Sequence, residues 1–182
     1  MNTRTTTLTA TLLTLLCAVL TMTACKEKKQ STEIIVTKQE QQQPAEPTAM
    51  HDSDFTEEIQ WIGKTYTITI SRRADSELPV VSDAQGVKYY DNRFTLSVNR
   101  NDGTTFYSHE FTKADFAGYV DAQYLSGNAL LGLVYEEADG DNLLFAASVG
   151  EPDPMSDDYV PLVLTLSRTG NLSIRRDTRP GQ

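Results

Sequence analysis

Cysteine and histidine are scarce in this sequence, and their scarcity restricts the chemistry that it can support. The 182 residues include 2 cysteines and 2 histidines, and Cys17 and Cys25 both stand near the N-terminus. The common zinc sites draw most of their ligands from cysteine and histidine, so we expect no such metal site in the rest of the chain. A domain that follows residue 25 has no disulfide and no free thiol, and its fold must rest on packing alone.

Motifs for nucleotide and nucleophile chemistry are missing as well. The sequence contains no P-loop, no dinucleotide-binding glycine pattern and no G-x-S-x-G turn. Its 25 acidic and 16 basic residues give a net charge of -9, whereas a nucleic-acid partner requires a basic face. We therefore predict no nucleic-acid, nucleotide or cofactor partner, and we assign no catalytic residue and no metal ligand.

The first 24 residues have the pattern of a secretory signal. A short apolar run, Leu8–Leu20, follows a positively charged start, and a small residue precedes the expected cleavage point. The run is shorter than the ~18 apolar residues that a membrane-spanning helix requires. Met22–Cys25 resembles a bacterial lipobox, although Met22 departs from the usual leucine. The resemblance implies a lipoprotein signal peptide at 1–24 and lipid attachment, with acyl chains such as palmitate, at Cys25, which anchors the protein to a membrane.

Residues 25–54 have the composition of a flexible tether between this anchor and a domain. The stretch is rich in glutamine, includes Pro44 and Pro47, and has no long apolar period. As a random coil it spans ~30 Å. Its one apolar patch, Ile34–Val36, is either available to pair with an open sheet edge or, as we prefer, without such a role.

Residues 55–178 predict a single β-rich domain, followed by a disordered tail at 179–182. Apolar and polar residues alternate with a period of two, and turn residues separate the segments. The expected strands are 65–70, 78–81, 94–99, 104–111, 131–135, 143–149, 159–167 and 172–177. About eight short strands with tight turns indicate an antiparallel sandwich or a partly open barrel.

Burial decides the register of two hairpins. A two-residue loop at Asp102–Gly103 places Val98 opposite Tyr107, Leu96 opposite His109 and Phe94 opposite Phe111, whereas a three-residue loop buries a carboxylate instead. We expect the first arrangement. Near the C-terminus, the apolar residues of 164–166 and 172–174 share a face only if their loop holds an odd number of residues, so we expect three.

One helix is predicted near 113–125. Thr112 and Asp115 have the spacing of a capping box, and Phe111 and Phe116 occupy the two positions of a hydrophobic staple. Phe116 and Val120 begin an apolar stripe that suits packing on the sheet.

The candidate polar sites have weak signals. Ser108 and His109 are adjacent on a strand and point to opposite faces, so they cannot form a dyad, and we expect His109 to be packed beside Leu96. Four carboxylates crowd one expected hairpin tip and suggest either a loose Ca²⁺ site or, as we prefer, a solvated turn: Glu136, Glu137, Asp139 and Asp141. The same applies to the carboxylates of the proline-rich loop: Asp153, Asp157 and Asp158.

Some aromatic and basic residues allow two interpretations. Trp61, Tyr89 and Tyr90 either line a ligand groove or, as we prefer, belong to the core and its rim. Arg72–Arg73 and Arg175–Arg176 lie at strand ends, where edge protection and salt bridging are the expected roles.

Six short segments carry a family resemblance. They are Trp61–Lys64, Asp91–Leu96, Phe111–Ala114, Asp139–Asp141 with Phe145–Val149, and Pro161–Val163. Together they resemble a family of small Bacteroidetes envelope lipoproteins known only as a domain of unknown function. The resemblance implies a cell-envelope location and supplies no activity. Lys26–Lys29 lacks the acidic run that marks surface export in such organisms, so the resemblance favours the periplasmic side of the outer membrane.

The sequence supports three hypotheses for function. The first is a non-enzymatic binding or adaptor module of the cell envelope, the second a carboxylate-dependent hydrolase of envelope glycans, and the third a structural partner that offers an open sheet edge to another envelope protein. A pocket with converging carboxylates would favour the second, and a long unpaired edge or apolar patch would favour the first or third.

Overall fold

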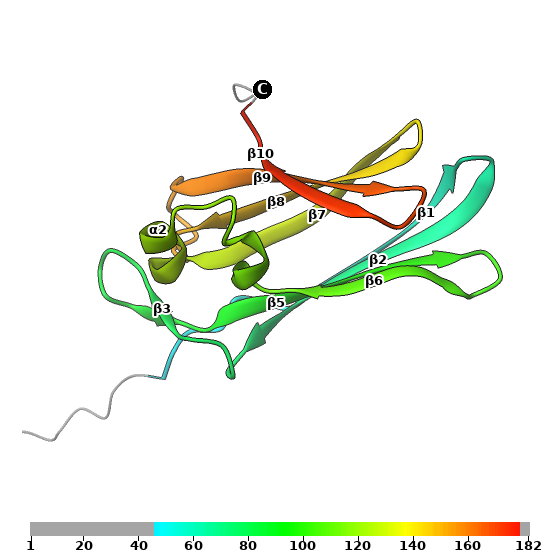
Figure 1. Cartoon of the computed structure of the whole chain (residues 1–182). Coiled ribbons are helices and arrows are strands. Elements are labelled where there is room, and N and C mark those ends of the chain that lie inside the picture. Colours follow the sequence, from blue (N-terminus) through cyan, green and yellow to red (C-terminus); the bar gives the residue numbers. More distant parts are fainter. Residues whose placement is uncertain (1–45, 179–182) are drawn as a thin grey trace, which may run out of the picture. The chain divides into compact units, whose positions relative to one another are not determined.

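The computed structural model describes residues 46–178 (Figure 1). The expected signal peptide, the expected lipid-attachment residue Cys25, the expected tether up to residue 45 with Ile34–Val36, and the expected tail at 179–182 lie outside the described residues. None of the helices in the described range is long and apolar enough to cross a membrane.

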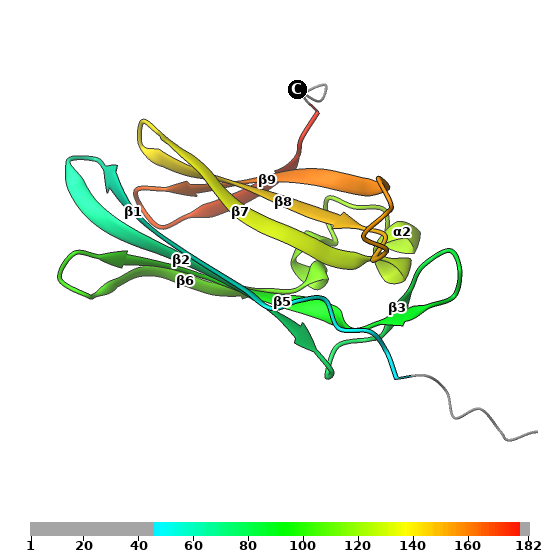
Figure 2. The same cartoon turned by 180° about the vertical axis from the view of Figure 1, so that it is seen from behind.

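Two four-stranded antiparallel sheets form the body of the domain. The first has the order β1 (Ser53–Trp61), β2 (Lys64–Asp75), β5 (Asp91–Arg100) and β6 (Thr105–Phe111). The second has the order β10 (Leu172–Arg176), β9 (Tyr159–Ser167), β8 (Asn142–Gly150) and β7 (Ala129–Asp139). A small third sheet pairs β3 (Val81–Ser82) with β4 (Lys88–Tyr89). Figures 1 and 2 show the two large sheets as facing layers, so the predicted antiparallel β fold is confirmed, as a sandwich.

The core lies between these layers because the apolar residues of each sheet alternate with outward polar residues. Tyr66, Ile68 and Ile70 of β2 share an inner face with Leu96 and Val98 of β5. The second sheet contributes the buried row Leu143, Phe145, Ala147 and Val149, together with Leu162, Leu164 and Leu166. A continuous apolar layer of this kind explains how the domain holds together without disulfides.

The strand β1 was not predicted, and it moves the start of the domain toward the N-terminus. It pairs with β2 along its whole length through a two-residue turn at Ile62–Gly63, where both residues have positive φ, 46° and 73°. Two positive φ angles define the type I′ hairpin turn, for which asparagine or glycine is preferred and isoleucine is unusual. Thr48 also bridges to Tyr89, so 46–54 contacts the domain that we expected to begin at residue 55.

The β5–β6 hairpin combines the two alternatives weighed from the sequence. The pairs Phe94–Phe111, Leu96–His109 and Val98–Tyr107 are confirmed. The tip nevertheless has the three-residue loop, because Arg100 N donates to Thr104 O at 2.8 Å. A bulge between the tip and Val98 absorbs the extra residue and restores the apolar register. The expected three-residue loop between β9 and β10 is confirmed by the pairs Leu166–Leu172 and Leu164–Ile174.

The helix expected near 113–125 is divided in two. A 3₁₀ turn, η1 (Lys113–Phe116), follows β6, and a short helix, α2 (Ala122–Gly127), comes later. The division occurs because the Asp121 carboxylate accepts hydrogen bonds from Gln123 N and Tyr124 N, which begins a new helix at that point. Phe116 and Val120 still reach the core, as predicted.

Candidate functional site

A pocket of about 440 Å³ is lined by residues from both large sheets and from the small β3–β4 sheet. Pockets of ~300–1,000 Å³ are typical of small-ligand sites. Its walls come from the N-terminal segment before β1, the C-terminal end of β2, the strand β4, the start of β7 and the loop after β8. The lining residues are Thr48, Ala49, Met50, His51, Arg72, Tyr89, Leu131, Glu151, Pro152, Asp153, Pro154 and Ser156.

The N-terminal wall is fixed by backbone and side-chain bonds. Thr48 N donates to Lys88 O at 2.8 Å, and Tyr90 N donates to Thr48 O at 3.0 Å. Two residues later, Met50 Sδ accepts from Asn92 Nδ2 at 3.1 Å. These contacts hold the segment in place, so this wall is formed before any ligand arrives.

Another wall is the loop that follows β8, and Glu151 organises it. Its Oε1 accepts from Ala84 N at 2.7 Å, and its Oε2 accepts from Ser156 Oγ at 2.6 Å. Asp153 Oδ1 accepts from Met155 N at 2.9 Å. A Cβ on Gly150 would overlap Asp158 O and Tyr159, so only glycine allows the close chain approach at the base of the loop.

Arg72 spans the space between the N-terminal segment and β7. It follows Ile68 and Ile70 on the inner face of β2, and its Nε and Nη2 donate to His51 O at 2.9 and 2.6 Å. Its Nη1 donates to Leu131 O at 3.4 Å. These acceptors are neutral carbonyls, and within residues 46–178 no carboxylate forms an ion pair with Arg72, unlike its neighbour Arg73, which binds Asp54 at 2.7 Å.

The electrostatic environment on the side of Tyr89 is negative. Burial raises the pKa of Tyr89, and its hydrogen bond to Asp83 and the charges of Asp83, Asp153 and Glu151 raise it further. The phenol donates to Asp83 Oδ2 at 3.1 Å. The pocket lining therefore combines the Arg72 guanidinium, the carboxylates of Glu151 and Asp153, and apolar side chains.

A buried polar cluster beneath the pocket fixes the position of β7. Asp91 Oδ1 accepts from Asn92 N at 2.8 Å and from Leu130 N at 2.9 Å, while Asp91 Oδ2 lies 3.3 Å from Lys113 Nζ. Lys113 also donates to Asn128 O at 2.8 Å, and Asn92 Nδ2 donates to Leu130 O at 2.8 Å. The cluster ties the first sheet to the start of the second and so places Leu131 beside Arg72.

Sequence reasoning missed this cluster and the role of Arg72, although a signal was present. Asn92 has the same parity as Phe94 and Leu96, and Arg72 has the same parity as Ile68 and Ile70. Residues two apart on a strand point to the same face, so both polar side chains continue an apolar row inward. The salt-bridging role expected of Arg72–Arg73 is confirmed for Arg73, whereas among residues 46–178 Arg72 binds backbone carbonyls instead.

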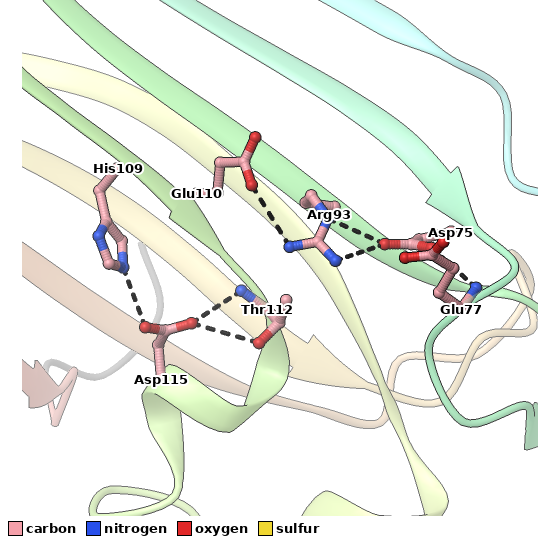
Figure 3. A network of polar contacts seen from close by, with 7 residues as sticks. All are labelled: Asp75, Glu77, Arg93, His109, Glu110, Thr112 and Asp115. Carbon is pink, nitrogen blue, oxygen red and sulfur yellow. Dashed lines mark hydrogen bonds and ion pairs between the residues drawn. The ribbon is translucent and has the colours of Figure 1, made fainter.

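The Ser108–His109 pair forms no dyad in the described domain. Ser108 Oγ lies 3.2 Å from Ser97 Oγ, whereas His109 Nε2 lies 3.0 Å from Asp115 Oδ1, as Figure 3 shows for the histidine. The expectation of a packed His109 is wrong, since 43% of its side chain is exposed on the edge strand β6. Burial raises the pKa of Asp115, but hydrogen bonds from His109 and Thr112 outweigh it and lower the pKa.

A second polar network in Figure 3 links strand ends on the surface. Arg93 Nη2 lies 2.6 Å from Asp75 Oδ2, and Arg93 Nη1 lies 3.4 Å from Glu110 Oε2. The hydrogen bond from Glu77 N, followed by that from Arg93, lowers the pKa of Asp75. This network braces β2, β5 and β6 and lies apart from the residues that line the pocket.

The other candidate residues from the sequence lie in different parts of the domain, some in the core and some at the surface. Trp61 belongs to the core and donates from Nε1 to Gly140 O at 3.2 Å, while Tyr89 lines the pocket and Tyr90 is half-buried. At the acidic hairpin tip, Asp141 forms an ion pair with Arg168 at 3.4 Å, so this carboxylate has a cationic partner from the protein itself. Among residues 46–178, no three His, Cys, Asp or Glu side chains converge as a metal site.

One sheet edge is long and regular. Among the described residues β1 pairs with β2 alone over nine residues and without a bulge. The edge strand β6 pairs through a bulge, the edge strand β7 has two bulges, and β10 is short. Bulges and shortness protect an edge from pairing, so β1 is the least protected edge of the sandwich.

Comparison with known proteins gives the family and no more. No curated protein matches the chain at the required significance. A family described as "Domain of unknown function (DUF4738)" matches residues 33–174, which include every strand but the end of β10 and begin before the described residues. On that match, the chain belongs to the family of the DUF4738 domain, whose function is unknown.

Proposed function

We propose that this protein is a lipid-anchored binding module of the bacterial cell envelope, and that the pocket between the N-terminal segment and the loop after β8 is its ligand site. The single observation that carries the binding role is a pre-formed pocket with an arginine that has no acidic partner in the described domain. The lipobox-like Met22–Cys25 supports the anchor, and the family resemblance supports a Bacteroidetes outer membrane, on its periplasmic side.

The pocket suits binding better than catalysis. Both Glu151 oxygens accept structural hydrogen bonds, and Asp153 Oδ1 caps its own loop. Ser156 donates to Glu151 rather than to a histidine, so it is not activated as a nucleophile. The polar groups therefore shape and charge the pocket.

A test of the anchor compares the wild type with Cys25→Ala. We expect radiolabelled fatty acid to enter the wild type in the outer-membrane fraction, and the variant to stay unlipidated and unprocessed. Fatty acid on Cys25→Ala, or a mature wild type with an unmodified thiol, would refute the anchor.

A test of the binding role compares small molecules that the purified protein retains from envelope extracts, measured by mass spectrometry. Leu131→Trp fills the pocket, and Val134→Trp is the matched control because it lies on the same strand with its side chain exposed. We expect a ligand that Val134→Trp retains and Leu131→Trp loses. Equal recovery from both variants contradicts a pocket site, and turnover of a glycan panel that Glu151→Gln abolishes would support the hydrolase instead.

A second candidate function is an adaptor that pairs its β1 edge with an envelope protein. The regular nine-residue edge favours it, and Phe55 stays partly exposed there. Crosslinking in intact envelopes discriminates the two, because Thr56→Pro on β1 should remove an adaptor contact and leave pocket binding intact.

A further inference from the structure

We infer that the pocket takes a short apolar peptide with a free carboxylate and a free ammonium group, the carboxylate bound at Arg72 and the ammonium at the Asp153 side. The inference rests on the proposed binding function and names its ligand class.

Arg72 supplies the anionic half of the argument. A guanidinium has five N–H donors, and three of those on Arg72 bind His51 O and Leu131 O. One donor remains on each terminal nitrogen, and two neighbouring donors suit the two oxygens of a carboxylate. A partly buried cation bound only to neutral carbonyls lacks a counter-charge, and a ligand carboxylate would provide it.

The loop after β8 supplies the cationic half. Asp153 Oδ1 accepts from Met155 N, which leaves Oδ2 as an acceptor, and Glu151 lies on the same wall. Both carboxylates act on Tyr89, so their negative field extends into the pocket. This field opposes a dianion such as a phosphate ester and favours an ammonium group.

The remaining lining residues supply the apolar contacts. Ala49 and Met50 belong to the N-terminal segment, whose His51 O binds Arg72, as Leu131 O does. Pro152 and Pro154 belong to the loop after β8. A purely apolar ligand would bury Arg72 without a counter-charge, and a free amino acid would leave much of the 440 Å³ unfilled. A di- or tripeptide with small or branched apolar side chains satisfies charge, polarity and size together.

The test uses the full chain in detergent micelles and isothermal titration with leucyl-alanine, its C-terminal amide and its N-acetyl derivative. A charge-assisted hydrogen bond contributes roughly tenfold or more to affinity. We expect leucyl-alanine to bind at least about tenfold more tightly than either derivative. These comparisons need only the wild type, so they do not depend on how a variant folds.

Variants then assign each charge to its residue. Arg72→Gln should weaken leucyl-alanine about tenfold and leave the affinity of the amide unchanged, and Arg72→Lys should restore part of the loss. Asp153→Asn should likewise weaken leucyl-alanine about tenfold and leave the affinity of the N-acetyl derivative unchanged. Arg100→Gln is the control, because Arg100 stacks on Phe106 in the β5–β6 hairpin and does not line the pocket. This variant should bind the peptide as the wild type does.

The results separate this inference from the function on which it rests. Equal affinity for the three peptides, or no binding of a panel of apolar di- and tripeptides at millimolar concentration, overturns the ligand class. If the extract experiment still yields a ligand that Leu131→Trp loses, the pocket function stands with another ligand. If neither experiment detects a pocket ligand, both proposals are wrong.

Discussion

The ion pair between Lys113 and Asp91 should dominate the stability of the region that forms the pocket. Only 13% of the Lys113 side chain and 1% of the Asp91 side chain are exposed. Lys113→Met keeps the length of the apolar stem but leaves the Asp91 carboxylate buried without its cation. Breaking a buried pair from one side costs ~3–5 kcal/mol. The two backbone N–H donors that remain on Asp91 Oδ1 place the expected loss near the lower end, about 3 kcal/mol.

Urea unfolding followed by fluorescence measures this loss. Trp61 is the only tryptophan of the chain and is buried, so its emission reports unfolding without labels. Arg168→Met is the matched control, since the Arg168 and Asp141 side chains are each 60% exposed and an exposed pair contributes within ~1 kcal/mol. The double variant Asp91→Asn with Lys113→Met should recover about 1 kcal/mol or more, because no unpaired charge is left. If Lys113→Met costs no more than Arg168→Met, the buried pair does not hold β7 in place.

Three further predictions concern turns, packing and pH. Ile62→Asn should raise the free energy of unfolding by ~0.5–1 kcal/mol in urea titrations, since asparagine suits the positive φ of that turn better than an exposed isoleucine; an unchanged midpoint would contradict strain there. Gly150→Ala should lower the melting temperature by several degrees and weaken ligand binding, because its Cβ would overlap Asp158 O, and a wild-type melting curve would contradict that close approach. The folded-state pKa of Asp115 is lowered, so its contribution to stability is present above the unfolded pKa, about 4, and is lost as the pH falls through the folded value. Asp115→Asn should therefore show a shallower acid loss of stability than the wild type in pH-dependent unfolding, and parallel curves would refute this.

Strand periodicity predicted most of the fold because the side-chain period of two is a direct consequence of strand geometry. It correctly paired Phe94 with Phe111 and fixed the odd loop between Leu166 and Leu172. It could not predict the bulge in β5–β6, because a bulge lets a three-residue tip coexist with the register of a two-residue tip. The strand β1 was missed because much of it is exposed and acidic, with only Ile59 and Trp61 buried.

Local sequence signals also compete with each other in the helical region. Thr112 and Asp115 begin a helix, as predicted, and Thr112 N donates to Asp115 Oδ2 at 2.8 Å. Asp121 offers a second helix start within the same stretch, and a capping signal alone does not say which start continues.

The pocket was out of reach of the sequence for a different reason. Its residues come from five segments, which include Tyr89 of β4, and only the packing of the sheets brings Met50, Arg72, Leu131 and Glu151 together. The parity that Arg72 shares with Ile68 and Ile70 indicates an inward side chain. It does not indicate that the guanidinium binds backbone carbonyls rather than carboxylates. A charged residue in an apolar strand row is therefore a useful pointer to a site even without a motif.

Methyl NMR of the full chain during titration with leucyl-alanine tests the central claim most directly. The account predicts saturable shifts at the Met50 and Leu131 methyl groups, which line the pocket, and none at Leu166 and Leu172 in the far β9–β10 hairpin. Shifts along Ile59 of the β1 edge with none at Met50 and Leu131, or an unchanged spectrum at millimolar peptide, would contradict it.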